Sequence, residues 1–169
     1  KDTTTILGGF GIENLENITF KNMTVTNASE YGDGIHMRNA KVELIDVVFK
    51  GCGNAGLFIP GSTSETTLVA TRCEFANSRY GAAVYGRLTS ATFKNCVFHD
   101  NENEGIWASS EATIHLHGEA TALHSNSNGI SSNFFSKVFI HLPSNHNTSY
   151  NNGGEDRAIE GGTITNVED

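Results

Sequence analysis

In the stretch Ile18-Thr19-Phe20-Lys21-Asn22-Met23-Thr24-Val25, apolar residues alternate with polar ones, pause for two residues, and then alternate again. Alternation with period two is typical of a β-strand that buries one face and leaves the other wet. The pause at Lys21-Asn22 indicates a sharp bend, because it lets the second run keep its apolar side chains on the buried side. The stretch therefore predicts two short strands joined by a bend.

The same frame recurs in the next three repeats of the chain. Its apolar positions are Val42, Leu44, Val47 and Phe49, then Leu68, Ala70, Cys73 and Phe75, then Ala91, Phe93, Cys96 and Phe98. The corresponding bend residues, which are predicted to form one stacked line, are Asn22, Asp46, Arg72 and Asn95. Asn and Asp suit such bends because their side chains bond the neighbouring backbone.

Later repeats depart from this frame. The fifth repeat has its apolar positions at Ile114, Leu116, Thr121 and Leu123, which requires two extra residues around 117–120. The sixth repeat is recognisable only as far as Ile140 and Leu142. We therefore expect the C-terminal third of the chain to be irregular.

A third strand precedes each bent pair and begins with a small residue followed by an apolar one. These pairs are Gly11-Ile12, Gly34-Ile35, Gly56-Leu57, Gly81-Ala82, Gly105-Ile106, Gly129-Ile130 and Ala158-Ile159. Successive pairs are separated by 23, 22, 25, 24, 24 and 29 residues. A near-constant period of this length is typical of a solenoid in which each repeat makes one circuit.

Three short strands per circuit predict three parallel sheets around one core, with about 4.8 Å between the strands of neighbouring coils. The crossover rule for parallel strands favours right-handed winding. No apolar stripe of period 3.6 persists, and antiparallel sandwiches do not repeat a three-strand frame. The predicted fold is all-β, a right-handed parallel β-helix solenoid of about seven coils.

Composition narrows the class of protein. The chain has 169 residues and a net charge of −8, which disfavours nucleic acid as a partner. No stretch reaches the roughly 18 apolar residues of a membrane span, so membrane insertion is not expected. We expect one domain, 1–169, cut from a longer or processed protein. Cys73 and Cys96 occupy apolar strand positions and are predicted to be free, buried thiols.

From Ile6 to about Ile164 this organisation resembles the pectate-lyase-like superfamily of right-handed β-helices. That superfamily includes polygalacturonases, pectate lyases, alginate epimerases, phage tailspikes and non-catalytic surface proteins, so the resemblance implies the fold but no particular reaction. The segment Tyr31-Gly32-Asp33-Gly34-Ile35-His36 is similar to the polygalacturonase Asn-Thr-Asp-Gly-Ile motif, whose Asp belongs to an acid/base trio. Asp33 matches that position.

The remaining positions of the polygalacturonase pattern do not match. The resemblance implies two further carboxylates where this chain has Asn54-Ala55, a histidine where it has Tyr80, and an arginine where it has Trp107. An inverting hydrolase needs one carboxylic acid to protonate the leaving oxygen and another carboxylate to activate water. Polygalacturonase activity is therefore not expected.

Two interpretations of this segment stay open. Asp33 and His36 are candidate catalytic groups for a lyase or epimerase, with Tyr31 and Arg38 as candidate substrate-binding groups. In the other interpretation, Asp33 is a turn residue before glycine and His36 lies on a solvated strand face.

A second candidate site is the outer wall of the sheet built from the Gly-Ile strands. Its predicted lines of outward residues are Glu13, His36, Phe58, Ala83, Trp107, Ser131 and Glu160, and then Arg38, Pro60, Tyr85, Ser109 and Asn133. Phe58, Tyr85 and Trp107 are predicted to form an aromatic strip on which sugar rings stack. Alternatively, a loop, another subunit or the rest of a longer chain covers these rings.

No cofactor is predicted. Acidic turns, at Glu30 and Asp33, at Asp100, Glu102 and Glu104, and at Glu155 and Asp156, are compatible with Ca²⁺, but no calcium-binding motif is present and a solvated acidic rim is preferred. His115 and His117 share one strand face without an obvious third ligand, so no metal site is assigned.

Sequons at Asn17, Asn22, Asn27 and Asn147 favour a secreted protein. The predicted function is a non-catalytic β-helix module, which serves as a scaffold or as a surface for polysaccharide or for neighbouring domains or subunits. We expect it in an extracellular, cell-surface or virion protein. The alternatives are a polysaccharide lyase, C5-epimerase or glycoside hydrolase acting on uronate-containing glycans, and a self-assembling structural shaft.

Overall fold

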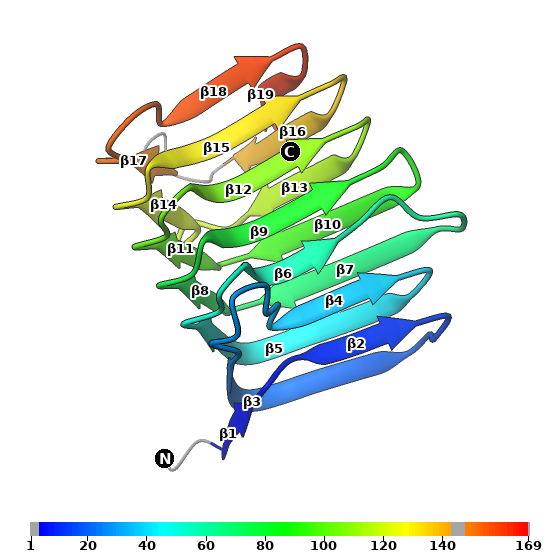
Figure 1. Cartoon of the computed structure of the whole chain (residues 1–169). Coiled ribbons are helices and arrows are strands. Elements are labelled where there is room, and N and C mark those ends of the chain that lie inside the picture. Colours follow the sequence, from blue (N-terminus) through cyan, green and yellow to red (C-terminus); the bar gives the residue numbers. More distant parts are fainter. Residues whose placement is uncertain (1–3, 143–147, 169) are drawn as a thin grey trace.

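The computed structural model describes residues 4–142 and 148–168, whose regular elements are the strands β1–β19. Asn147 and His146 lie outside the described residues, as does the side chain of Leu142. No helix in the described ranges has the length and apolar character needed to cross a membrane. The strands are stacked in coils from the blue N-terminal end to the red C-terminal end (Figure 1).

The smaller sheet contains seven parallel strands, and the order in space follows the order in sequence. They are β2 (Phe10–Glu13), β4 (Ile35–Arg38), β6 (Ala55–Ile59), β9 (Tyr80–Tyr85), β12 (Glu104–Ser109), β15 (Asn128–Asn133) and β18 (Arg157–Glu160). These are the predicted Gly-Ile strands. The seven strands mark the starts of seven coils and are separated by six complete turns.

The larger sheet contains twelve strands and bends along its length. Strands on the near side of the bend, or running through it, are β3 (Ile18–Thr26), β5 (Lys41–Lys50), β7 (Thr66–Thr71), β10 (Thr89–Lys94), β13 (Thr113–His117), β16 (Lys137–Leu142) and β19 (Thr163–Glu168). Strands beyond the bend are β1 (Thr4–Leu7), β8 (Glu74–Ala76), β11 (Val97–His99), β14 (Ala122–His124) and β17 (Ser149–Tyr150). Because β3 and β5 continue through the bend, two of the three predicted sheets are joined into one.

The predicted bend residues share one backbone conformation. Asn22, Asp46, Arg72 and Asn95 have φ values of 54°, 54°, 52° and 53°. Asn and Asp tolerate this left-handed region, whereas a long side chain enters it less readily. At Arg72 the conformational cost of the positive φ is offset by a bidentate bond to the preceding coil. Its Nε and Nη2 donate to Asp46 Oδ1 and Oδ2 at 2.8 and 2.7 Å. The predicted line of bends is confirmed.

The two extra residues of the fifth coil are also confirmed. Lys94 pairs with His117 and Val97 pairs with Ala122, so two residues in one coil correspond to four in the next. The longer corner turns at Gly118, which has a φ of 90°. It closes on itself, because Thr121 donates its backbone N–H to the Gly118 carbonyl at 3.1 Å.

Aromatic rings fill the core in a stack that follows the coils. Phe49, Phe75 and Phe98 are fully buried and occupy the same position in successive coils. Their ring centroids are 5.2 and 4.8 Å apart, with interplanar angles of 12° and 6°. Cys73 and Cys96 are free and buried, as predicted, and so is Cys52.

An asparagine ladder lines the corner between the larger sheet and the smaller one. Asn101, Asn126 and Asn152 occupy this corner in successive coils. Nδ2 of Asn101 donates to Asn126 Oδ1 at 2.8 Å, and Nδ2 of Asn126 donates to Asn152 Oδ1 at 3.1 Å. Each side-chain amide also reaches a backbone carbonyl of the preceding coil, which for Asn126 is that of Phe98. The sequence predicted a stacked line of bend residues, whereas this ladder at the other corner was not predicted.

The register differs from prediction in the first coil. Ile12 pairs with Met37 instead of Ile35, so Glu13 lies beside Arg38 and not beside His36. The reason is that Phe10 takes the position opposite Ile35, where its ring packs against Phe20 at 4.7 Å.

The last coil is also shifted. Ile159 pairs with Ser132 instead of Ile130, and Glu160 pairs with Asn133 instead of Ser131. The predicted alignment of the Ala158-Ile159 pair was therefore wrong by two residues. Ile159 is 55% exposed because β18 is the last strand of the smaller sheet, with a neighbouring strand on one side.

Replacing Asn126 with alanine should lower the free energy of unfolding by about 2 to 4 kcal/mol, because the Phe98 carbonyl and the Asn101 backbone N–H lose their partner in a buried site. Urea denaturation measures the change. The matched control is Asn103→Ala, at a position two residues after Asn101 that does not belong to the ladder. It should change the free energy of unfolding by less than about 0.5 kcal/mol. Equal stability of the two variants would contradict the ladder's structural role.

Candidate functional site

The outer wall of the smaller sheet carries the predicted aromatic residues in adjacent coils. Phe58 and Trp107 both pair with Ala83, one from each side, and Tyr85 lies two residues beyond Ala83 on the same strand. Ala83 is an outward residue, yet it is 2% exposed. The rings on either side cover it, so they form a continuous layer over the sheet instead of three separate side chains.

We define the aromatic strip as Phe58, Tyr80, Tyr85 and Trp107. Tyr85 contacts Phe58 at 5.7 Å and Trp107 at 5.4 Å between ring centroids, both nearly edge to face. Tyr80 adds a tilted contact with Trp107 at 5.3 Å. Tyr80 was not predicted as part of the strip, because it stands where the polygalacturonase resemblance implies a histidine.

Burial affects the polar groups of the strip. Burial, followed by the charges of Tyr80 and Glu104, raises the pKa of Tyr85 to about 12. The indole Nε1 of Trp107 is buried and has no hydrogen-bond partner among residues 4–142 and 148–168. Such an unpartnered donor costs free energy.

Polar groups and a shallow hollow border the aromatic strip. Ser131 Oγ and Asn128 Nδ2 donate to Glu104 Oε1 at 3.3 and 3.4 Å, and the Arg79 guanidinium lies 5.5 Å from the Tyr80 ring centre. On the other side, a hollow of about 350 Å³ is lined by Phe58, Pro60, Gly61, Tyr85, Gly86 and Ser110. The strip thus combines half-buried aromatic rings with hydrogen-bonding neighbours.

The structure brings Asp33 and His36 together, as the catalytic interpretation requires. Asp33 Oδ2 lies 3.1 Å from His36 Nδ1. Its Oδ1, however, accepts from Asn54 Nδ2 at 2.8 Å and from the Ala55 backbone N–H at 3.2 Å, and the Asp33 side chain is only 10% exposed. The carboxylate therefore links two coils.

The other two predicted substrate-binding residues lie apart from the aromatic strip. Tyr31 is 75% exposed in the turn before β4. Arg38 lies at the end of β4, beside Glu13 of the first coil and two strands away from the strand of Tyr85. His36 connects the two predicted sites, since its ring is 5.1 Å from that of Phe58.

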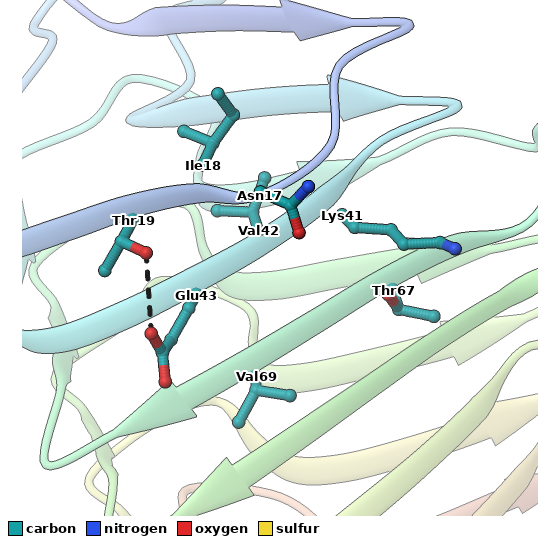
Figure 2. Close-up of a pocket in the computed structure, with 8 residues that line it drawn as sticks. All are labelled: Asn17, Ile18, Thr19, Lys41, Val42, Glu43, Thr67 and Val69. Carbon is teal, nitrogen blue, oxygen red and sulfur yellow. Dashed lines mark hydrogen bonds between the residues drawn. The ribbon is translucent and has the colours of Figure 1, made fainter.

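A second hollow lies on the outer face of the larger sheet (Figure 2). Thr19 Oγ1 donates to Glu43 Oε2 at 3.5 Å across it. Lys41 Nζ is paired with Glu16 at 3.3 Å and Glu65 at 3.6 Å, and the hydrogen bond to Glu16 and these carboxylate charges raise the lysine pKa. The hollow is therefore an ion-paired surface trough.

Residues of the acidic turns bond to protein groups. Asp100 Oδ2 lies 2.6 Å from His99 Nδ1, and Asp156 Oδ1 accepts from Asn152 Nδ2 at 2.8 Å. The preference for a solvated acidic rim over a Ca²⁺ site at these turns stays a prediction.

Within the described residues, one group of three or more His, Cys, Asp or Glu side chains has its ligand atoms in mutual reach, namely His115, His117 and His141. His141, the third residue of this group, was not predicted as a partner of His115 and His117. A separation of 26 residues from His115, close to one coil, was the available signal.

Comparison with known proteins gives one match. The family described as "Right handed beta helix region" matches residues 8–168, nearly the whole chain, and its handedness agrees with the predicted winding. No curated protein matches. No solved structure matches.

Replacing Asp33 separates its bonding role from its charge. Asp33→Asn keeps an Oδ1 acceptor for Asn54 and Ala55 and should cost less than about 1 kcal/mol, whereas Asp33→Ala leaves both donors unpaired and should cost about 1 to 3 kcal/mol. Urea denaturation of both variants provides the measurement. If the two variants lose equal stability, the acceptor geometry is not what Asp33 contributes.

Spectrophotometric titration should find one of the four tyrosines ionising near pH 12, and Tyr85→Phe should remove that transition. The pKa of Tyr85 in the folded protein lies above the unfolded value of about 10. The contribution of the neutral Tyr85 side chain to the free energy of unfolding is therefore complete below about pH 10 and is lost as the pH rises toward 12. A Tyr85→Phe titration curve that keeps its last transition would assign the shifted pKa to another tyrosine.

Proposed function

We propose that this chain, which belongs to the right-handed beta helix region family, is a non-catalytic module that binds polysaccharide along the aromatic strip. The fold of this family supports many functions, so the proposal rests on the surface of the protein. The observation that carries this proposal is the unbroken row of ring contacts Phe58–Tyr85–Trp107–Tyr80 on an outer sheet face. Apolar C–H faces of sugar rings stack on such rings while bordering polar groups bond the hydroxyls.

The geometry of the strip favours an elongated ligand. Phe58, Tyr85 and Trp107 come from three successive coils, and parallel strands are about 4.8 Å apart. A chain of sugars lying along the helix axis therefore meets rings at regular intervals. Glu104, Ser131 and Asn128 supply acceptors and donors at one edge, and the hollow beside Tyr85 gives room at the other.

Charge favours a neutral polysaccharide over a polyuronate. The chain carries a net charge of −8, and the carboxylate of Glu104 borders the strip. Both repel a polyanion, because like charges in one surface region raise the free energy of encounter. A neutral glycan avoids this cost.

Binding without catalysis is favoured by the surroundings of Asp33. Both of its oxygens are within hydrogen-bond distance of protein groups, and one of its donors, Asn54, stands where a hydrolase carries a second carboxylate. A general acid/base pair needs two titratable groups free to reach the substrate. The arrangement supports a role for Asp33 in coil stacking.

We place the protein outside the cell, on a cell surface or in a virion. Sequons at Asn17 and Asn22, both exposed, support this location. At Asn27 the side-chain Nδ2 donates to the Asp33 carbonyl at 2.9 Å, so a glycan attached to this nitrogen would leave it one N–H for that bond.

On arrays of neutral and uronate-containing polysaccharides, the protein should bind neutral chains, and Trp107→Ala should weaken binding at least tenfold, or about 1.4 kcal/mol. Titration calorimetry with the best array ligand measures the loss. Phe135→Ala, which removes a 77% exposed aromatic ring outside the strip, is the matched control and should bind like the parent.

Circular dichroism of each variant confirms that the fold is retained. Absence of glycan binding by the folded parent protein would exclude the proposal, as would equal loss of affinity in the Phe135 variant. Release of shortened or unsaturated products from any polysaccharide would instead favour an enzyme.

A further inference from the structure

A cluster of three histidines lies on the outer face of the larger sheet, away from the aromatic strip. We propose that His115, His117 and His141 form a binding site for one Zn²⁺ ion. Each side chain offers one ring nitrogen, and the three ligand atoms all lie within 4.8 Å of one another.

Stacking of two coils creates the cluster. On β13, Ile114 and Leu116 point into the core and are fully buried, so the alternate residues His115 and His117 point outward. Register between the coils pairs Leu116 with Ile140, which places His141 one residue further along β16, next to His117. Two histidines on one strand and a third on its neighbour thus face the same patch of surface.

Distances in the cluster are close to those of a metal site. His115 Nδ1 lies 2.9 Å from His141 Nε2, and the rings of His117 and His141 are stacked with centroids 3.9 Å apart. Tetrahedral zinc with Zn–N bonds of about 2.0 to 2.1 Å needs nitrogens roughly 3.4 Å apart. Small side-chain rotations therefore bring the three nitrogens to coordination distance without moving the strands.

Zinc binds the neutral form of imidazole. Burial, followed by the charge of His141, lowers the pKa of His115, which is the direction that a metal ligand requires.

Neighbouring groups limit the choice of metal. On the adjacent β10, Thr92 pairs with His115 and Lys94 with His117, while on β19 Val167 pairs with His141. The set contains three imidazoles and no carboxylate, which suits Zn²⁺, Cu²⁺ or Ni²⁺ and disfavours Ca²⁺ and Mg²⁺. The Lys94 ammonium reduces affinity through repulsion. Three protein ligands leave a fourth position for water or an added ligand.

Calorimetric titration of tag-free protein with Zn²⁺ at pH 7.5 tests the site. We expect one ion per chain, reversal by a chelator, and a visible absorption band of tetrahedral Co²⁺ when cobalt replaces zinc. Affinity should fall as the pH is lowered, because metal binding requires deprotonated ligands.

His141→Gln and His115→Gln should each weaken zinc binding by more than about 100-fold, because each removes one of three ligands; loss of a group that only orients a ligand costs about 10-fold to 100-fold. The matched control is His124→Gln, which removes a histidine on β14 that stacks on His99 and Tyr150. It should bind zinc like the parent. Thermal unfolding of metal-free protein checks that each variant is folded.

Three results would overturn the site: no zinc uptake by the parent, unchanged uptake in folded His141→Gln, or equal loss in His124→Gln. The first result would leave the cluster as a stack of surface imidazoles.

Discussion

Hydrogen bonding between coils is the constraint on which the whole structure depends. Each strand pairs in parallel with the corresponding strand of the next coil. Backbone N–H and C=O groups must therefore face their partners at the same position along the strand in the next coil. A side chain is consequently placed beside the residue at its own position in neighbouring coils. Phe49, Phe75 and Phe98 stack for this reason, and so do Asn101, Asn126 and Asn152.

The same constraint produces both candidate sites on the outside. Parallel stacking places Phe58, Tyr85 and Trp107 on one wall and His115, His117 and His141 on another. Neither group is close in sequence, since each draws residues from more than one coil. The chemistry of such a surface is set by which residue types recur at one outward position, while the inward positions stay apolar. Binding surfaces and core can therefore vary independently.

The sequence alone predicts those parts of the fold that depend on local alternation. The bends at Asn22, Asp46, Arg72 and Asn95 were found because each separates two apolar runs within one coil. The predicted register of the first coil was wrong because the packing of Phe10 against Phe20 sets the pairing of its strand. The Gly-Ile pattern does not show this packing. His141 was missed because its place beside His117 depends on the pairing of Leu116 with Ile140 in the next coil.

The corner at Gly118 shows how this chain separates length from register. Four residues replace two there, the added backbone bonds to itself and to Asn95, and pairing resumes unchanged at Ala122. Evolution or a protein engineer can therefore lengthen that corner without re-aligning any strand. An inserted peptide would leave the β-helix at this corner of the fifth coil, which makes the corner a natural attachment point for new loops.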